Sequence, residues 1–212
     1  AGFEFVDSIV GGKLSATATS GDLLFGGSVI VGMTQLNRRY SRVANRTTNK
    51  TIGNIDLEAT GGSILNNNLR INARNINQGI GGRNKWLYLE GNTITLTAAN
   101  TIGTTRNRLK IDAKTLNART TSKNPDSDIN ISDKGNLKLA NVKTANGDIN
   151  IDSDGFVRLV QPRILKVGTR GNHIRIIDRA EIARLAAERR RLAALMASLQ
   201  ATTAITESPA ET

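Results

Sequence analysis

The second half of the sequence repeats itself with a fixed period. Residues 127–131 (Ser-Asp-Ile-Asn-Ile) return 20 positions later as residues 147–151 (Gly-Asp-Ile-Asn-Ile), and residues 135–139 return in the same way as residues 155–159. A short fixed period is typical of stacked architectures in which each repeat contacts only its neighbours. Within each unit, apolar residues alternate with polar ones, which is the period of a strand with one buried face. The sequence therefore predicts an all-β fold, a parallel β-helix or solenoid.

The repeat also predicts which side chains lie on neighbouring turns. An offset of 20 residues places Asn130 next to Asn150 and places Lys138 next to Arg158 on the outer face. Asparagine tolerates tight corners and can hydrogen-bond to an asparagine on the adjacent turn. Two adjacent cations repel each other unless they splay into water or meet an anion.

Weaker matches extend the repeat toward the N-terminus. The offset of 20 places residues 109–111 beside residues 129–131, and a second match with an offset of 22 places residues 87–89 beside residues 109–111. Insertions at corners would produce this change of offset. We expect regular turns over residues 53–177, about six at this period.

The first 52 residues depart from the regular repeat. Residues 1–37 are apolar and rich in glycine, which predicts either irregular first turns or a sheet that caps the end of the stack. Residues 38–50 contain five basic residues and no acidic one. We interpret this basic segment either as a solvated loop or as a contact for a polyanion.

The C-terminal residues predict one α-helix over residues 178–200, followed by a flexible tail over residues 201–212. Asp178 can cap the helix, and Glu181 occupies the position of a capping box. Arg189 interrupts an apolar stripe formed by Ile182, Leu185, Leu192, Met196 and Leu199. We expect the helix to pack along the stack or cap its last turn; the alternative is pairing with a helix of another copy or another protein.

Composition and motifs argue against catalysis and metal binding. The chain has no cysteine, and His173 is its only histidine. Asn150, Asp152 and Asp154 match the first half of a calcium loop, but Gln161 stands where that motif needs a bidentate glutamate. Turn propensity explains most of the acidic residues, which lie at corners. We therefore predict no catalytic residue, no cofactor and no metal ligand.

The charge points to anionic partners. A net charge of +11 favours polyanionic glycans, lipid headgroups or nucleic acid, but an aromatic content of 3% disfavours nucleic acid. No run of residues is apolar enough to span a bilayer. The predicted partner contacts are Arg38, Arg39, Arg42, Lys138 and Arg158 for anions, and Ile182, Leu185, Leu192 and Met196 for a protein or a second copy.

The repeats carry a family resemblance. Residues 100–104 (Asn-Thr-Ile-Gly-Thr), followed by residues 108–113, resemble repeats of filamentous-haemagglutinin-like proteins. The alternation of Gly-Asp-Ile-Asn-Ile with Gly-Asn-Leu-Lys-Leu is similar to the same family. These are large secreted bacterial β-helical adhesins, often exported through a partner outer-membrane pore. The resemblance covers roughly residues 53–177 and implies a right-handed β-helix. The Asn-Pro-rich signature of the secretion domain is absent from these residues, so the resemblance implies a repeat shaft or a distal piece and not the secretion-guiding module.

The resemblance and the composition together lead to a functional expectation. We expect a non-enzymatic structural or adhesive protein with a stiff β-helical shaft, extracellular or at the bacterial cell surface in association with the outer membrane. Because the chain begins with Ala1, we interpret it as a mature or excised product of a longer precursor; the alternative is that the sequence was cut at an arbitrary boundary. One alternative is a subunit of an envelope or filament assembly that docks through the C-terminal helix. Another is a polysaccharide-acting β-helix enzyme, which would need carboxylates or basic residues clustered in a groove.

Overall fold

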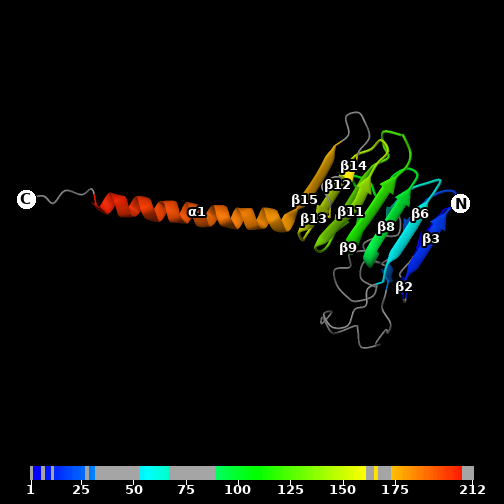
Figure 1. Cartoon of the computed structure of the whole chain (residues 1–212), viewed down its shortest axis with the longest axis horizontal. Coiled ribbons are helices and arrows are strands. Elements are labelled where there is room, and N and C mark those ends of the chain that lie inside the picture. The colour runs from blue at the N-terminus through cyan, green and yellow to red at the C-terminus, as the bar shows by residue number, and fades with distance from the viewer. Residues whose placement is uncertain are drawn as a thin grey trace, which may run out of the picture.

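The computed structural model of the chain shows a stack of parallel strands from which one long helix projects (Figure 1). It describes residues 2–5, 8–10, 12–26, 29–31, 53–66, 89–160, 165–166 and 173–206. The strands form a β-solenoid of about five turns. The predicted all-β parallel solenoid with a single C-terminal helix is confirmed.

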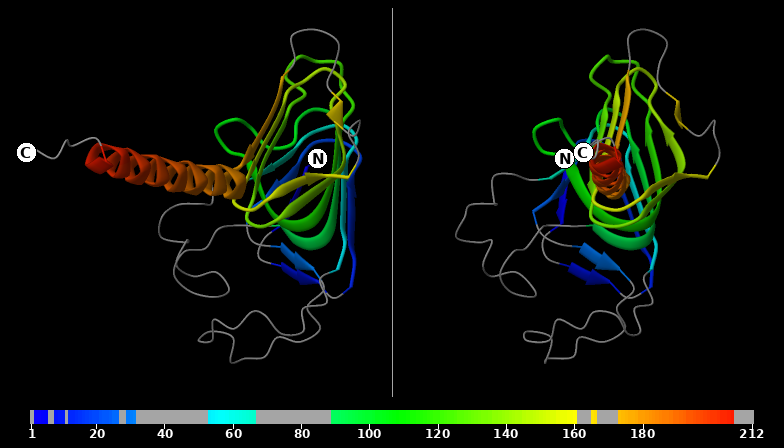
Figure 2. Two further views of the ribbon diagram at one scale, coloured as in Figure 1. Left: turned by 60° about the vertical axis from the view of Figure 1, so that its left-hand side comes forward. Right: turned by 90° about the vertical axis from the view of Figure 1, so that its left-hand side faces the viewer.

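The first turns have three sides, as the views in Figure 2 show. One side contains β1 (Phe3–Phe5), β4 (Leu23–Phe25) and β7 (Ile64–Asn66). The next contains β2 (Ser8–Val10), β5 (Val29–Val31) and the start of β8 (Leu89–Ala98). The third contains β3 (Leu14–Ala18), β6 (Ile55–Ala59) and the end of β8. These N-terminal strands pair in register with later ones, so they are turns of the stack and not a separate cap.

The later turns continue two of these sides. The first half of β9 (Leu109–Thr120) is followed by β10 (Ile129–Asp133), β12 (Ile149–Ser153) and β15 (Ile174–Asp178). The second half of β9 is followed by β11 (Leu137–Lys143), which pairs with both β13 (Val157–Leu159) and β14 (Leu165–Lys166). The side that began with β1, β4 and β7 is reduced to isolated bridges at Ile102, which pairs with Ile64 and Ile129.

The register within the strongest repeat is the predicted one. Asn130 pairs with Asn150, and the Nδ2 of Asn150 donates a hydrogen bond of 3.1 Å to the Oδ1 of Asn130. Lys138 pairs with Arg158. A repeat of 20 residues therefore corresponds to one turn of the solenoid in this part of the chain.

The predicted register of residues 109–111 is wrong by two positions. Leu109 pairs with Ile131 rather than with Ile129, while Ile129 bridges to Ile102. A shift of two residues keeps every apolar side chain on the inner face, so the alternating pattern cannot distinguish the two registers. The other predicted match holds where the structure describes it, since Leu89 pairs with Ile111.

The expected six turns over residues 53–177 are too many. Ile55 of β6 pairs with Ile94 of β8, which lies 39 positions later, so one turn here takes about twice the repeat length. Self-matching cannot reveal such an insertion, because the inserted residues need not repeat.

The core is a narrow column of aliphatic side chains that runs along the solenoid. Alternate residues of each strand point inward, and Leu57, Leu96, Ile129 and Ile149 are almost fully buried. At the N-terminal end, the rings of Phe5 and Phe25 stack with centroids 5.2 Å apart. Each buried aliphatic side chain contributes about 1.5–3 kcal/mol relative to an exposed one.

Helix α1 (Arg179–Thr206) follows β15 without a loop. The predicted cap is present, because the Oδ1 of Asp178 accepts a hydrogen bond of 2.7 Å from the backbone N–H of Glu181. The Glu181 carboxylate pairs with Arg184. The helix continues through Thr206, beyond the expected end at residue 200, and residues 207–212 of the predicted tail lie outside the described residues.

Candidate interaction surfaces

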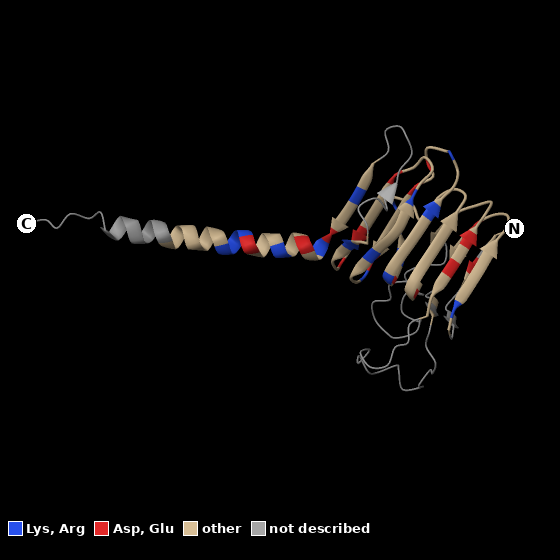
Figure 3. Ribbon diagram, in the orientation of Figure 1, with Lys and Arg blue, Asp and Glu red and all other residues tan. Residues whose placement is uncertain are grey.

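A basic face covers the C-terminal part of the sheet that contains β9, β11 and β13. The register places Lys138 beside Arg158 and Lys143 beside Arg119. Figure 3 shows Lys and Arg on these three strands. Residues 114–120, 136–143 and 156–160 contain no acidic residue and five basic ones, which are Lys114, Arg119, Lys138, Lys143 and Arg158. We call these five residues the basic face.

A shallow cleft crosses the basic face at its corner. It is lined by Lys114, Asn136, Leu137, Lys138, Phe156 and Arg158. The backbone N–H of Phe156 donates a hydrogen bond of 2.9 Å to the Oδ1 of Asn136 one turn away, which fixes this corner. The Phe156 side chain is 49% exposed, so an apolar ring lies beside three cations.

The arrangement on the basic face suits an anion. Adjacent strands are about 4.8 Å apart, so Lys138 and Arg158 repel each other. Among the described residues, no ion pair joins either of them to a carboxylate. A negatively charged group placed between them would relieve this repulsion and gain two favourable contacts.

The same sheet changes its charge along the solenoid axis. Asp56 and Glu58 point outward on β6, where Lys13 lies 3.6 Å from Asp56. Threonines occupy the outward positions of β8, and the basic face follows on β9, β11 and β13. The outward side chains of β6 are therefore acidic, and those on the later strands of this sheet are basic (Figure 3).

An ion-pair network around the Asp152 carboxylate joins the helix to the stack. The Asp152 carboxylate accepts hydrogen bonds from Arg179 at 2.6–2.7 Å and from Arg108 at 3.0 Å. The hydrogen bond from Arg179 holds the pKa of Asp152 below its usual range, against the effect of partial burial. The sequence did not reveal Arg108 in this role, because its partner lies 44 positions away.

The network occupies the residues of the calcium-like motif. Asp152 and Asp154 both face Arg179, the latter at 3.6 Å, while the Asn150 amide bonds to Asn130. A guanidinium thus lies where a cation would have to bind. Within the described ranges, no group of three His, Cys, Asp or Glu residues is placed to hold a metal ion.

Asp133 is a buried carboxyl group at a corner of the stack. It accepts hydrogen bonds from the backbone N–H groups of Ala113 at 3.2 Å and Gly135 at 2.9 Å, and from the Ser153 hydroxyl at 3.3 Å. Burial raises the pKa of Asp133 to about 7; the nearby Asp112 acts in the same direction, and these hydrogen bonds oppose it. The sequence predicted a corner here but gave no indication that the carboxyl is buried.

The helix does not pack along the stack, contrary to our expectation. Ile182, Leu185, Leu192 and Met196 are all more than half exposed, because α1 leaves the end of the solenoid and extends away from it (Figures 1 and 2). The Asp178 cap and the Arg179–Asp152 ion pair fix the direction in which the helix starts. The apolar pattern indicates which face of a helix can form apolar contacts, but it carries no information about what covers that face.

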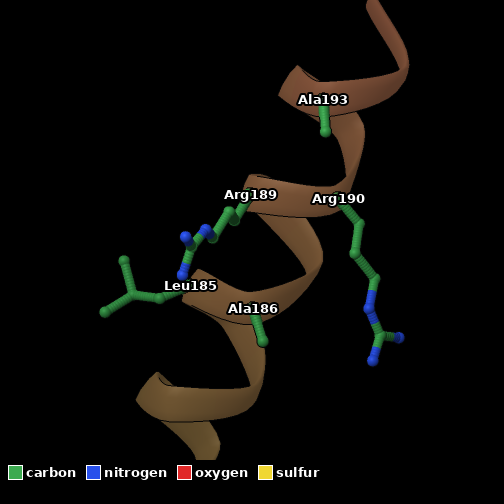
Figure 4. Close-up of a pocket in the computed structure, with 5 residues that line it drawn as sticks. All are labelled: Leu185, Ala186, Arg189, Arg190 and Ala193. Atoms are coloured by element: carbon green, nitrogen blue, oxygen red, sulfur yellow. The ribbon is translucent and has the colours of Figure 1, made fainter.

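A close view of the helix shows how its apolar stripe is interrupted. Leu185 and Arg189 point to one side, and Arg190 points to the other (Figure 4). These residues line a shallow depression together with Ala186 and Ala193. The stripe therefore offers a partner an apolar surface with a cation at its centre.

The other residues singled out in the sequence analysis are the N-terminal arginines and the single histidine. Arg38, Arg39 and Arg42 lie outside the described residues. The His173 side chain is largely exposed, and its Nδ1 lies 3.9 Å from Asp148. The cleft on the basic face has no acidic residue in its lining.

Comparisons with known proteins add no identification. No protein-family model matches the sequence, and no match is found among curated proteins or solved structures. Among the described residues, no helix has the length and hydropathy to cross a membrane.

Proposed function

We propose that the chain is a non-enzymatic structural protein, the shaft of a secreted or cell-surface adhesin, which binds anionic polymers through its basic face. The parallel ladder supports the role of a shaft. Strands hydrogen-bond to the next turn all along the stack, and the buried core continues through the turns. Such a stack resists bending and keeps its exposed faces in fixed register.

The observation that carries the proposal is the basic face. Four of its five cations lie in pairs on neighbouring strands, Lys138 with Arg158 and Lys143 with Arg119, with no acidic residue on the same strand segments. A polymer with one negative charge per unit can place successive charges on successive turns. Phe156 adds an apolar ring against which the nonpolar face of a sugar can pack. The scarcity of aromatic residues disfavours a ligand that binds by base stacking.

The test is a charge reversal on this face. We expect the double variant Lys138→Glu/Arg158→Glu to bind immobilised dextran sulfate roughly tenfold or more weakly, since each lost ion pair contributes up to about 1 kcal/mol and each reversed charge adds repulsion. The measurement is the affinity by biolayer interferometry at fixed ionic strength. Circular dichroism checks that both variants are folded.

The control for this test is Arg106→Glu/Lys123→Glu. Both of its positions are exposed and outside the basic face, and the change in net charge is the same. If both double variants lose the same affinity, the binding depends on net charge alone and the proposed site is wrong.

A second function is favoured by one specific observation. The helix stands away from the stack with its apolar stripe exposed. In a subunit of an envelope or filament assembly, such a helix would dock onto another helix. This candidate requires a defined oligomer that depends on the helix stripe.

A further inference from the structure

The cleft on the basic face runs along the solenoid axis. Its three cations come from the same corner of three successive strands, with Lys114 on β9, Lys138 on β11 and Arg158 on β13. Lys138 pairs with Thr115, the residue that follows Lys114, and with Arg158 on the next turn. Each of these turns therefore contributes one cation, and the turns follow one another at about 4.8 Å along the axis.

Cations are much farther apart in the direction of the strands. On β11, the next cation after Lys138 is Lys143, and on β9, the next cation after Lys114 is Arg119. Both steps cover five residues, which is roughly 15 Å along a strand. A linear polymer with a negative charge on every unit therefore meets a cation at each turn only if it lies across the strands, parallel to the solenoid axis.

The three cations of the cleft are available to a ligand. Lys114, Lys138 and Arg158 are exposed. In the described part of the chain, none of them forms an ion pair or a side-chain hydrogen bond, and no acidic residue lines the cleft. A carboxylate placed in the cleft would accept charge-assisted hydrogen bonds from them without displacing an existing partner.

The cleft also contains groups that suit a sugar ring. The Phe156 side chain is 49% exposed, and an aromatic ring of this kind packs against the nonpolar face of a sugar. Asn136 uses its Oδ1 to accept from the backbone N–H of Phe156, while its Nδ2 donates to no other described residue. That amide can donate to a sugar hydroxyl. The cleft thus presents a partner for a carboxylate, a hydroxyl and a nonpolar ring face.

We propose that this cleft binds an oligosaccharide of uronic acids, with its chain parallel to the solenoid axis and its carboxylates directed at Lys114, Lys138 and Arg158. One sugar ring packs on Phe156. The site rests on the proposed binding of anionic polymers by the basic face, and it specifies the ligand class. A polyphosphate carries the charges but has no nonpolar ring face, so it uses the cations and not Phe156.

The direction of the chain is tested by nuclear magnetic resonance. Backbone amide shifts of the isotope-labelled protein are recorded during titration with trigalacturonate at fixed ionic strength. We expect the largest shifts at the lining of the cleft, which is Lys114, Asn136, Leu137, Lys138, Phe156 and Arg158. A chain lying along the strands would instead shift Lys138 together with Lys143. That pattern, or the absence of shifts at the cleft, overturns the proposal.

A matched pair of lysine variants tests the same point by affinity. Lys114→Ala and Lys143→Ala each remove one cation from the basic face, but only Lys114 lines the cleft. We expect Lys114→Ala to weaken the binding of trigalacturonate roughly threefold to fivefold, as for one exposed ion pair, and Lys143→Ala to weaken it less than twofold. Equal losses would show that the ligand responds to the total charge of the face and does not occupy the cleft.

The ring of Phe156 distinguishes a sugar from a simple polyanion. Phe156→Ala is expected to weaken trigalacturonate roughly fivefold and to leave the affinity for tripolyphosphate within twofold, whereas Phe156→Tyr keeps the ring and the affinity for both ligands. Circular dichroism checks the fold of each variant. If Phe156→Ala weakens both ligands equally, or weakens neither, no sugar packs on the ring and the assigned ligand class is wrong.

The uronate site and the general anion binding can fail separately. Suppose that Lys138→Glu/Arg158→Glu loses dextran sulfate binding relative to its control, while Lys114→Ala and Phe156→Ala bind trigalacturonate as the wild type does. The basic face then binds anions, but the cleft is no uronate site. If the charge reversal behaves like its control as well, the proposed function fails together with the site.

Discussion

At the scale of single residues, one position at the corner of each turn recurs along the stack. Asp133, Ser153 and Asp178 occupy equivalent corner positions on successive turns. Each accepts a hydrogen bond from a backbone N–H group of its own corner, at Gly135, Gly155 and Glu181 respectively. At Asp133 and Ser153 this position forms a corner of the solenoid, whereas at Asp178 it caps the start of helix α1.

Asp133 should make the stability of the stack depend on pH. An aspartate in an unfolded chain has a pKa near 3.9, and that of Asp133 in the folded chain is about 7. Between these values the folded state holds a proton that the unfolded state has lost, so stability falls as the pH rises from about 4 to 7, by at most about 4 kcal/mol. Asp133→Asn should abolish this part of the slope, as measured by urea unfolding from pH 4 to pH 8.

The control for Asp133 is Asp126→Asn, because Asp126 is exposed at a corner. We expect Asp133→Asn to be less stable at pH 4, since its amide cannot accept from Ala113, Gly135 and Ser153 in the way the carboxyl does. If the slope of Asp133→Asn equals that of the wild type, Asp133 does not hold its proton in the folded state.

At the scale of elements, the solenoid and the helix are stabilised by different forces. The strands depend on burial of their inward side chains and on the ladder between turns. The helix residues Ile182, Leu185, Leu192 and Met196 are exposed, so the described part of the helix depends on its length, its alanines, its cap and its side-chain pairs. Glu181 and Arg184 form one such pair at 2.6 Å, and Arg184 lies 3.5 Å from Glu188.

Removing the cap should therefore weaken the helix measurably. In Asp178→Ala, the backbone N–H groups of Glu181 and Val157 lose their acceptors at 2.7 and 2.8 Å, at a cost of about 1–2 kcal/mol. We expect a lower helical signal at 222 nm and a lower midpoint for its thermal loss. Asp178→Asn retains an acceptor for Glu181 and should lose much less. Equal losses in the two variants would mean that the cap does not support the helix.

At the scale of the whole molecule, the chain is a stack of strands from which one helix extends (Figure 1). The exposed stripe of this helix favours docking onto another helix, whereas the basic face favours anionic polymers. Because the two surfaces share no residue, they can be tested separately.

If copies of the chain associate through the apolar stripe of helix α1, making the stripe polar should lower the molecular mass of the protein in solution. We expect Leu185→Glu/Leu192→Glu to reduce a defined oligomer to a monomer in light scattering after size exclusion, because two carboxylates would enter an apolar contact. Ala187→Glu/Ala194→Glu adds the same charge on the opposite face of the helix and should leave the mass unchanged. A wild-type mass equal to that of Leu185→Glu/Leu192→Glu at all concentrations contradicts self-docking through the stripe.

The sequence alone was sufficient for the architecture and for the local register of the strongest repeat. Alternation of apolar residues and a period of 20 predicted parallel stacking, the pair Asn130–Asn150 and the pair Lys138–Arg158, because these depend only on which residues face inward. The cap at Asp178 was predictable for the same reason, since capping depends on a few adjacent residues.

Only the tertiary structure decided the features that depend on contacts between distant residues. The shift of residues 109–111, the long turn between Ile55 and Ile94, and the pairing of Arg108 with Asp152 have no local signal. The direction of the helix and the exposure of Leu159 depend on what does, or does not, lie beyond the last turn. An inward-facing residue has the same sequence pattern in the middle of a stack as at its end, and only its neighbours determine whether it is buried.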